Sequence, residues 1–334
     1  MTSLSDLLAK KGVLMADGAT GTTLFEMGLS AGDPPELWNV DHPDRVKRLH
    51  AGFLAAGSDI ILTNTFGANK HRLKLHRAEG RVFELNQRGA EIACEAAREA
   101  GREVVVAGSV GPTGELFEPL GSLTEEDAVD AFTEQARGLK AGGADVCWIE
   151  TMSAPAEIRA AAQGAINAGM PYTSTASFDT AGRTMMGLKP DGLAAVFDGL
   201  SQPPQAFGAN CGVGASDLVL SVLAIDGAKH GWGVIAKANC GIPVVHGEHV
   251  HYSGTPELMG NYARLAMDAG ATIIGGCCGT TPEHLTAIRA AIDSHNRGDK
   301  PDRERIEALI GPLAAPPREE GAAPRKRTGR RERA

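Results

Sequence analysis

Cys277 and Cys278 stand side by side near the end of this sequence, with glycines on both sides. The apolar run before them, residues 271–274, predicts a buried strand, and the segment 280–284 has the Thr, Pro and Glu that are typical of a helix start. The two thiols are therefore expected at the C-terminal end of a strand, where α/β folds carry their chemistry. Cys211 takes a similar position in a second glycine-rich segment.

Three thiolates that converge from two strand ends could hold a zinc ion with its fourth position open, as in a catalytic site. Adjacent cysteines point to opposite sides of a regular strand, but the flanking glycines let the backbone turn so that Cys277 and Cys278 face one ion. The alternative for a single cysteine is a small buried hydrophobic residue, as expected for Cys94 and Cys147. We predict that Cys211, Cys277 and Cys278 are metal ligands.

The charge of such a centre indicates its chemistry. Zn²⁺ with three thiolates carries one net negative charge, and a fourth thiolate makes it two, so the ion does little to polarise water. The centre suits the binding of a thiol, whose pKa it lowers and which then attacks carbon.

Eight β-rich runs, each followed by a helical pattern, must position these residues. This number over about 290 residues predicts a (β/α)8 TIM barrel, and apolar runs without strict alternation are typical of buried parallel strands. An open doubly wound sheet is the alternative, but the segment 17–23 lacks the third glycine of a dinucleotide fingerprint, and the sequence has no P-loop. The expected strands are 13–18, 59–66, 104–109, 145–151, 171–178, 206–210, 233–239 and 272–276.

Residues 1–297 are predicted to form this barrel, beginning with a short amphipathic helix within residues 1–11 that does not look like an export signal. Residues 298–334 are rich in Pro, Ala and Glu and then in Arg and Lys, so we expect a low-complexity basic tail that is disordered. Such a tail would keep the protein in solution or dock an acidic partner.

The composition excludes several classes of function. Aromatic residues make up only 4% of the chain and the formal net charge is −8, so nucleic acid is not expected as the main partner. No apolar run is long enough for a membrane span. We expect a cytoplasmic protein whose six cysteines are free or metal-bound rather than paired in disulfides.

In a barrel, the C-terminal ends of all eight strands open on one face. The polar side chains expected there include no histidine. Ser-His or Cys-His catalysis would therefore lack its general base, and a metal-dependent hydrolase would lack histidine ligands. His249 and His251 could ligate a metal from one face of a strand, but we expect a solvated loop over 246–251. The residues expected on the face are Asp17, Asn64, Thr65, Ser109, Glu150, Thr151, Asn210, Cys211, Asn239, Cys277 and Cys278.

Six motifs together resemble the zinc-dependent homocysteine S-methyltransferases. This family includes betaine–homocysteine methyltransferase, S-methylmethionine-dependent enzymes and the homocysteine module of cobalamin-dependent methionine synthase. The resemblance covers residues from about 12 to 295 and implies a (β/α)8 barrel. The motifs are DGATGT at 17–22, LTNTFG at 62–67, GPTGE at 111–115, IET at 149–151, GANC at 208–211 and GGCCGTTPEH at 275–284.

The resemblance implies that Cys211, Cys277 and Cys278 are the three zinc ligands and that the homocysteine sulfur is the fourth. It implies that Asp17 and Glu150 hold the substrate ammonium, and two acids at strand ends suit a cation. The homocysteine thiolate would then attack a methyl group in line, and methionine would leave.

The same resemblance places the substrate carboxylate on backbone N–H groups around Asn64, Thr65 and Phe66. Asn239 matches an asparagine near the metal that could ligate it when the substrate is absent. The sequence departs from the family pattern at the next position, where Cys240 replaces an expected small residue.

The methyl donor is the second substrate, and the pattern at 36–43 together with the basic tail looks most like bacterial betaine-dependent chains. Betaine is a quaternary ammonium ion that favours an aromatic surface, to which Trp38 could contribute. The alternatives are S-methylmethionine, dimethylsulfoniopropionate, or a corrinoid protein that partners this chain in a split methionine synthase. A non-catalytic zinc-binding barrel is the alternative outside methyl transfer.

Overall fold

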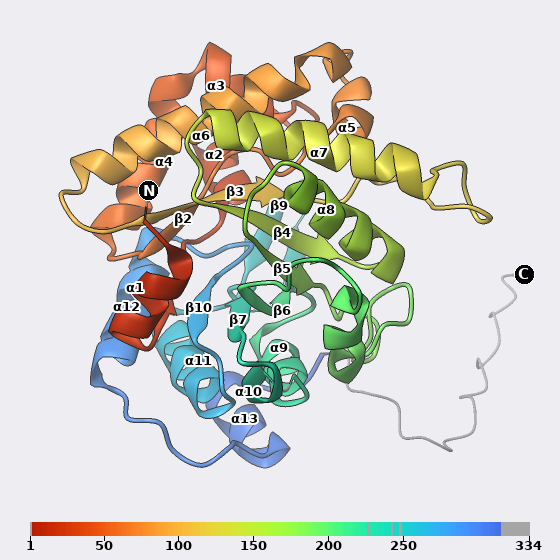
Figure 1. Ribbon diagram of the computed structural model, residues 1–334. Helices are drawn as coiled ribbons and strands as arrows, with labels where there is room; N and C mark the ends of the chain where they lie inside the picture. Colours follow the sequence, from red (N-terminus) through yellow and green to blue (C-terminus); the bar gives the residue numbers. More distant parts are fainter. Residues whose placement is uncertain (1, 226, 242, 247–248, 315–334) are drawn as a thin grey trace, which may run out of the picture.

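Eight parallel strands form one sheet in a computed structural model that describes residues 2–225, 227–241, 243–246 and 249–314 (Figure 1). The sheet order is β1-β10-β7-β6-β5-β4-β3-β2, and a parallel bridge between Ala16 and Ile60 joins its two edges. The (β/α)8 barrel predicted from the sequence is therefore confirmed. The strands are β1 (Leu14–Met15), β2 (Ile60–Leu62), β3 (Val105–Val110), β4 (Val146–Met152), β5 (Tyr172–Ala176), β6 (Ala206–Cys211), β7 (Gly233–Ala238) and β10 (Ile273–Gly276).

Helices surround the strands on the outside of the barrel (Figure 1). The helix that follows the cysteine pair begins as the sequence predicts, because Thr281 and His284 form a reciprocal capping box and Pro282 occupies the first turn. The α-helices are α1 (Leu4–Lys11), α2 (Thr20–Glu26), α3 (Trp38–Asp41), α4 (Pro43–Ala55), α5 (Lys70–Lys74), α6 (Val82–Glu99), α7 (Glu125–Ala141), α8 (Pro155–Asn167), α9 (Ala215–Leu223), α10 (Gly227–His230), α11 (Pro256–Asp268), α12 (Pro282–Ser294) and α13 (Arg303–Ile310).

Short 3-10 helices lie in the loops that follow strands β1, β2 and β5. They are η1 (Pro35–Leu37), η2 (Glu79–Arg81), η3 (Pro190–Gly192) and η4 (Ala194–Phe197).

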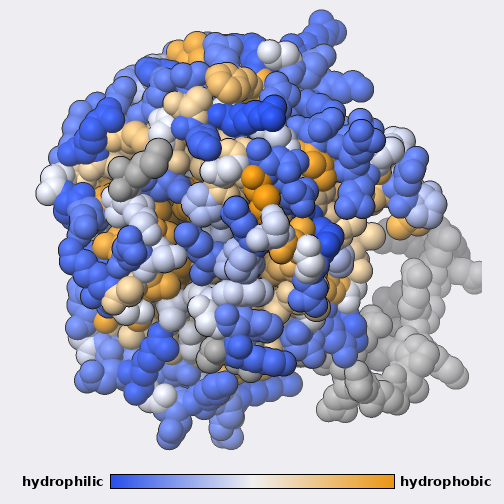
Figure 2. All heavy atoms as spheres, viewed as in Figure 1, coloured by the Kyte–Doolittle hydropathy of each residue, from blue (hydrophilic) through white to orange (hydrophobic). Residues whose placement is uncertain are grey.

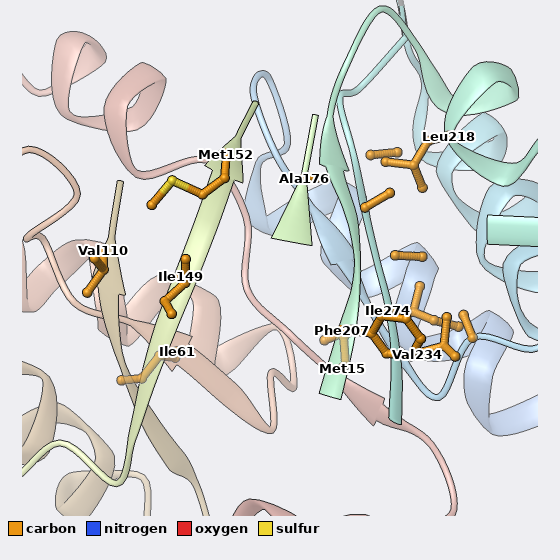
Figure 3. Close-up of a cluster of buried hydrophobic side chains, with 14 of the residues drawn as sticks. Met15, Ile61, Val110, Ile149, Met152, Ala176, Phe207, Leu218, Val234 and Ile274 are labelled. Carbon is orange, nitrogen blue, oxygen red and sulfur yellow. The ribbon is translucent and has the colours of Figure 1, made fainter. Parts of the chain in front are cut away.

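The strands are apolar on both faces, which explains why their sequences do not alternate. One face packs against the helices in a large cluster that includes Ile61, Ile149 and Phe207 (Figure 3). The other face fills the barrel with a second cluster that includes Trp148 and Ile235. Residues of α1 join this second cluster, so the predicted N-terminal helix closes the end of the barrel opposite the cysteines. On the face shown in Figure 2 the outer surface is mostly hydrophilic, with smaller hydrophobic areas.

Two expectations from the sequence need correction. The segment 246–251 was expected as a solvated loop, but His246 ends strand β8 (Pro243–His246) and residues 249–251 belong to strand β9 (His249–Tyr252), which pairs antiparallel with β8. The β-branched residues Val244, Val245 and Val250 favour strands. Residues 247–248 lie outside the described residues. The predicted tail at 298–334 contains α13, whose Ile306 and Ile310 are buried beside α9 and α11. Residues 315–334 of that tail lie outside the described residues. Among the described helices, none combines the length and the hydropathy that a membrane span requires.

The packing of α13 makes a stability prediction. Deleting residues 298–334 is expected to lower the free energy of unfolding by about 3 kcal/mol or more, because Ile306 and Ile310 lose their burial and the ion pair of Arg305 with Asp268 is lost. Urea unfolding followed by circular dichroism measures the change. The matched control deletes only residues 315–334 and should leave the midpoint unchanged. Equal stability of both truncations would show that α13 does not stabilise the barrel.

Candidate metal centre and active site

A cavity of about 550 Å³ opens at the C-terminal ends of the barrel strands. Its wall comes from the loops that follow β1, β2 and β10 and from the C-terminal parts of β3, β4, β6 and β7, as expected for the functional face of this fold. Three predicted ligands and most of the predicted substrate residues share this wall. The polar, aromatic and sulfur-bearing side chains of the wall include Asn64, Thr65, Phe66, Ser109, Glu150, Cys211, Lys237, Cys277 and Cys278.

The sulfur atoms of Cys211, Cys277 and Cys278 all lie within 4.8 Å of one another, and they form the single such cluster of potential metal ligands among the described residues. Cys211 has a φ of 61° at the end of β6, and Gly212 follows with a φ of 73°. Left-handed backbone at a non-glycine residue is strained and is often kept at functional sites. This turn directs the Cys211 sulfur across to the other two.

Backbone bonds fix the cysteine pair just past the end of β10. The Cys277 N–H donates to the Ala238 carbonyl (2.6 Å), and the Cys278 carbonyl accepts from the N–H of Cys240 (2.9 Å). Gly279 has a φ of 77°, so the chain turns there as the glycine frame predicts. The turn is what lets two adjacent side chains approach one point.

The cysteines form a donor set that fits a divalent cation. A hydrogen bond with Cys277, together with burial, raises the pKa of the Cys211 thiol to about 12, and contact with Cys211 raises the pKa of Cys278 to about 11. Three thiolates this close together therefore need a positive charge between them. Three sulfur ligands, with no His, Cys, Asp or Glu of the described residues as a fourth, match the open coordination of catalytic zinc sites.

Two asparagines hold the cysteine loops together. The Asn239 amide group donates to the Gly212 carbonyl (2.8 Å), and its oxygen accepts from the Cys278 N–H (3.1 Å). Asn239 thus joins the two cysteine-bearing loops, and its ligation of a metal stays a prediction. Asn210 places its amide nitrogen 3.8 Å from the Cys277 sulfur, a contact that orients a ligand from outside the centre.

Tyr252, at the end of β9, is a site residue that the sequence analysis missed. It interacts with Cys278, and burial raises the pKa of its phenol. A side chain on Gly279 would lie 2.3 Å from the Tyr252 ring, so the glycine makes room for the tyrosine. The sequence feature that could have identified Tyr252 is the strand over residues 249–252, because this strand brings Tyr252 to the cysteine loop at Gly279.

The two predicted carboxylates reach the same end of the barrel but have different partners. Glu150 lines the cavity and accepts a hydrogen bond from the Ser109 hydroxyl (2.5 Å). Burial raises the pKa of Glu150 above its usual range, and the charge of Lys237 opposes this shift. Asp17 is fully buried and pairs with the Lys237 ammonium at 2.7 Å. The prediction that both acids contact the substrate ammonium stays a prediction.

Lys237 is the second site residue that the sequence analysis missed. Burial alone would lower its pKa, but the charges of Asp17 and Glu150 raise it above the ordinary value, so the side chain is charged. The sequence carried a signal, because alternation along β7 places Lys237 on the same inward face as Ile235. Lys237 is hard to identify from the sequence because the rest of β7 is apolar or glycine.

Asn64, Thr65 and Phe66 line the cavity as predicted. The Asn64 side chain is fixed by bonds to the Pro35 carbonyl (2.7 Å) and the Asn39 side chain (3.0 Å). The N–H groups of Asn64 and Phe66 donate to no other described residue. Two such donors beside a cavity can bind a carboxylate.

Trp38 is not brought to the cavity. It is 7% exposed and lies in α3, with the Arg45 guanidinium 4.8 Å from its ring centre and the His42 ring at 5.0 Å. Among the described residues that line the cavity, Phe66 is the single Phe, Tyr or Trp. The aromatic surface expected for a quaternary ammonium donor is therefore confined to one ring there.

Comparisons with known proteins found related sequences and a related fold. Residues 14–292 match the homocysteine S-methyltransferase family. The chain is 31% identical over 321 residues to methionine synthase of Mycobacterium leprae (strain TN), covering 91% of this chain and 26% of that protein. It is 30% identical over 316 residues to methionine synthase of Mycobacterium tuberculosis (strain ATCC 25618 / H37Rv), covering 90% and 26%. The chain thus spans 26% of the length of each of these relatives.

Among solved structures, the fold is similar to the metallated form of the homocysteine methyltransferase MmuM from Escherichia coli, with a TM-score of 0.69. That match covers 85% of this chain and 98% of the other at 23% identity. The family match extends from β1 through the cysteine pair into α12 and so contains all three clustered thiols. On this evidence the chain belongs to the homocysteine S-methyltransferase family.

Proposed function

We propose that this protein transfers a methyl group to the sulfur of L-homocysteine and forms methionine, with zinc held by Cys211, Cys277 and Cys278. The observation that carries the proposal is the convergence of three thiols and a buried carboxylate on one cavity. A thiol-rich metal centre favours thiol substrates, and a carboxylate beside it favours a substrate that also carries an ammonium group.

The protein groups supply binding and orientation. Glu150 would hold the ammonium group of homocysteine, and the N–H groups of Asn64 and Phe66 would hold its carboxylate. Zinc, when bound at the three cysteines, supplies positive charge that lowers the pKa of the substrate thiol. With both ends of the amino acid fixed, the sulfur faces the cavity in one orientation for in-line attack on a methyl group.

The amino-acid contacts argue against the alternative of a non-catalytic zinc-binding barrel. A centre that only stores metal has no use for a buried carboxylate and two open N–H donors beside the thiols. Glu150 is 8% exposed, and burying such a group is costly unless it has a partner. An ammonium group of the substrate would be that partner.

Two donors remain as candidates. Betaine is the donor predicted from the sequence pattern. Among the described residues that line the cavity, however, Phe66 is the single Phe, Tyr or Trp that could contact its quaternary ammonium group. A corrinoid protein is the second candidate donor, and this chain would then activate homocysteine for the methyl group that the corrinoid protein delivers. The similarity to methionine synthases and the small aromatic area of the cavity wall favour this candidate. Exposed apolar residues in the loops after β3 and β5 could contact such a protein; they are Leu116, Leu120, Met185 and Met186.

A donor panel tests the proposal and separates these candidates. The purified zinc-loaded protein is mixed with L-homocysteine and betaine, S-methylmethionine, dimethylsulfoniopropionate or a methylcobalamin protein, and methionine is measured. We expect methionine with one donor class and none without homocysteine. Turnover with betaine would support the betaine-dependent function, and turnover with the methylcobalamin protein alone would support the split methionine synthase. No methionine with any donor would contradict the proposed function.

A further inference from the structure

Lys237 is a fully buried lysine in the middle of the substrate site. Its side chain is 2% exposed, and its ammonium lies 5.9 Å from the centre of the Trp148 ring inside the barrel. A buried charge is stable only where it is paired. Its ion-pair partner is Asp17, and the nearby carboxylate of Glu150 adds to the attraction.

The bonds of Asp17 leave it little capacity for a substrate. One carboxylate oxygen accepts from the Lys237 ammonium (2.7 Å), and the other accepts from the backbone N–H of Leu62 (2.7 Å). Asp17 is 0% exposed and is not part of the cavity wall, whereas Lys237 and Glu150 both line it. Lys237 therefore bonds to Asp17 and itself lines the space that a ligand would fill.

The charges of this cluster balance when Glu150 takes up either a proton or a cation. With both carboxylates ionised, Asp17 and Glu150 carry two negative charges against the one positive charge of Lys237, and burial, which raises the pKa of Glu150, disfavours that state unless a cation binds there. The side-chain hydrogen-bond partner of Glu150 is the neutral hydroxyl group of Ser109. One further ammonium group beside Glu150 makes the cluster neutral, and a low-dielectric site favours that balance.

We propose that Lys237 is a positioning residue that keeps Asp17 as its own counter-ion and so leaves Glu150, rather than Asp17, as the carboxylate for the ammonium group of the amino-acid substrate. This inference rests on the proposed function. It differs from the expectation that Asp17 and Glu150 share the substrate ammonium, because here Asp17 acts only through Lys237. Removing Asp17 alone would free Lys237 to pair with Glu150 and exclude the substrate.

The test measures the dissociation constant of L-homocysteine by isothermal titration calorimetry on zinc-loaded protein without a methyl donor. Asp17→Asn is expected to weaken binding about tenfold or more, because the unpaired ammonium of Lys237 competes for Glu150. The double variant Asp17→Asn/Lys237→Met is expected to recover most of that loss. Adding Glu150→Gln to the double variant should again weaken binding about tenfold or more.

Other results overturn the inference. If Asp17 contacts the substrate directly, the double variant binds at least as weakly as Asp17→Asn alone. If the pair is only structural, Asp17→Asn binds as the wild type does. Zinc content and thermal unfolding identify variants that are misfolded. Should the single variant not fold, the double variant decides, since a loss below about tenfold supports the inference and a larger loss contradicts it.

The wild-type protein provides the control for the proposed function. If it binds no homocysteine, the proposed function fails before Lys237 is at issue. If it binds homocysteine but the double variant does not recover affinity, only the role of Lys237 fails.

Discussion

Replacing Cys277 or Cys278 by alanine is expected to remove zinc and activity together. Each change leaves two sulfur ligands, and the measured zinc should fall from one ion per chain to a small fraction of that value. Activity should fall more than about a hundredfold. Loss of a residue that only contacts a metal ligand lowers activity by at most about a hundredfold, so a larger loss is expected for a ligand itself. Elemental analysis of the purified variants and a methionine assay measure the two effects.

Cys94→Ala is the matched control for these variants. Cys94 lies in α6, where its thiol donates to the Gly143 carbonyl at 3.3 Å, and it is not part of the thiol cluster. Its replacement should leave the zinc content at one ion per chain. Unchanged zinc in both Cys277→Ala and Cys278→Ala would contradict the ligand assignment.

Replacing Glu150 by glutamine is expected to raise the KM for homocysteine between about tenfold and a hundredfold while zinc stays bound. The reason is the loss of one charge-assisted hydrogen bond to the substrate ammonium. Glutamine keeps the size of the side chain and an acceptor for Ser109, so the effect reports on charge. Steady-state kinetics at saturating donor concentration, together with zinc analysis, give the two quantities.

Glu157→Gln is the matched control, because Glu157 is a buried glutamate on this side of the barrel, outside the cavity. It bonds to the backbone N–H (2.8 Å) and the hydroxyl group (2.6 Å) of Thr113 and does not line the cavity. Its replacement should change stability but not the KM for homocysteine. A normal KM in Glu150→Gln would remove Glu150 from the substrate site.

The sequence predicted the barrel and the thiol cluster because both leave local signals. Buried parallel strands require apolar runs, and a cysteine pair that turns toward one point requires glycines around it. The strand ends differ from prediction mainly by a few residues, as where β2 ends at Leu62 rather than at Phe66. The polar residues Thr63, Asn64 and Thr65 line the cavity, and they lie beyond the last residue of β2 that pairs with β3.

The partners of the site residues could not be predicted, because they depend on distances across the barrel. The pairing of Asp17 with Lys237 joins residues 220 positions apart. Trp38 carries an aromatic ring that suits a donor site, but Arg45 in the next helix covers it. The sequence did not predict α13, because the composition of residues 298–334 is typical of a disordered tail. Ile306 and Ile310 lie one helical turn apart, but two apolar residues at this spacing are only a weak signal of a helix.

The central claim is that three cysteine sulfurs share one cation and leave a position for the substrate sulfur. Absorption spectroscopy of the protein with cobalt(II) in place of zinc tests it most directly. The account predicts intense sulfur-to-cobalt charge-transfer bands that change when L-homocysteine is added and do not change with L-serine. Absence of these bands, or bands that are indifferent to homocysteine, would contradict it.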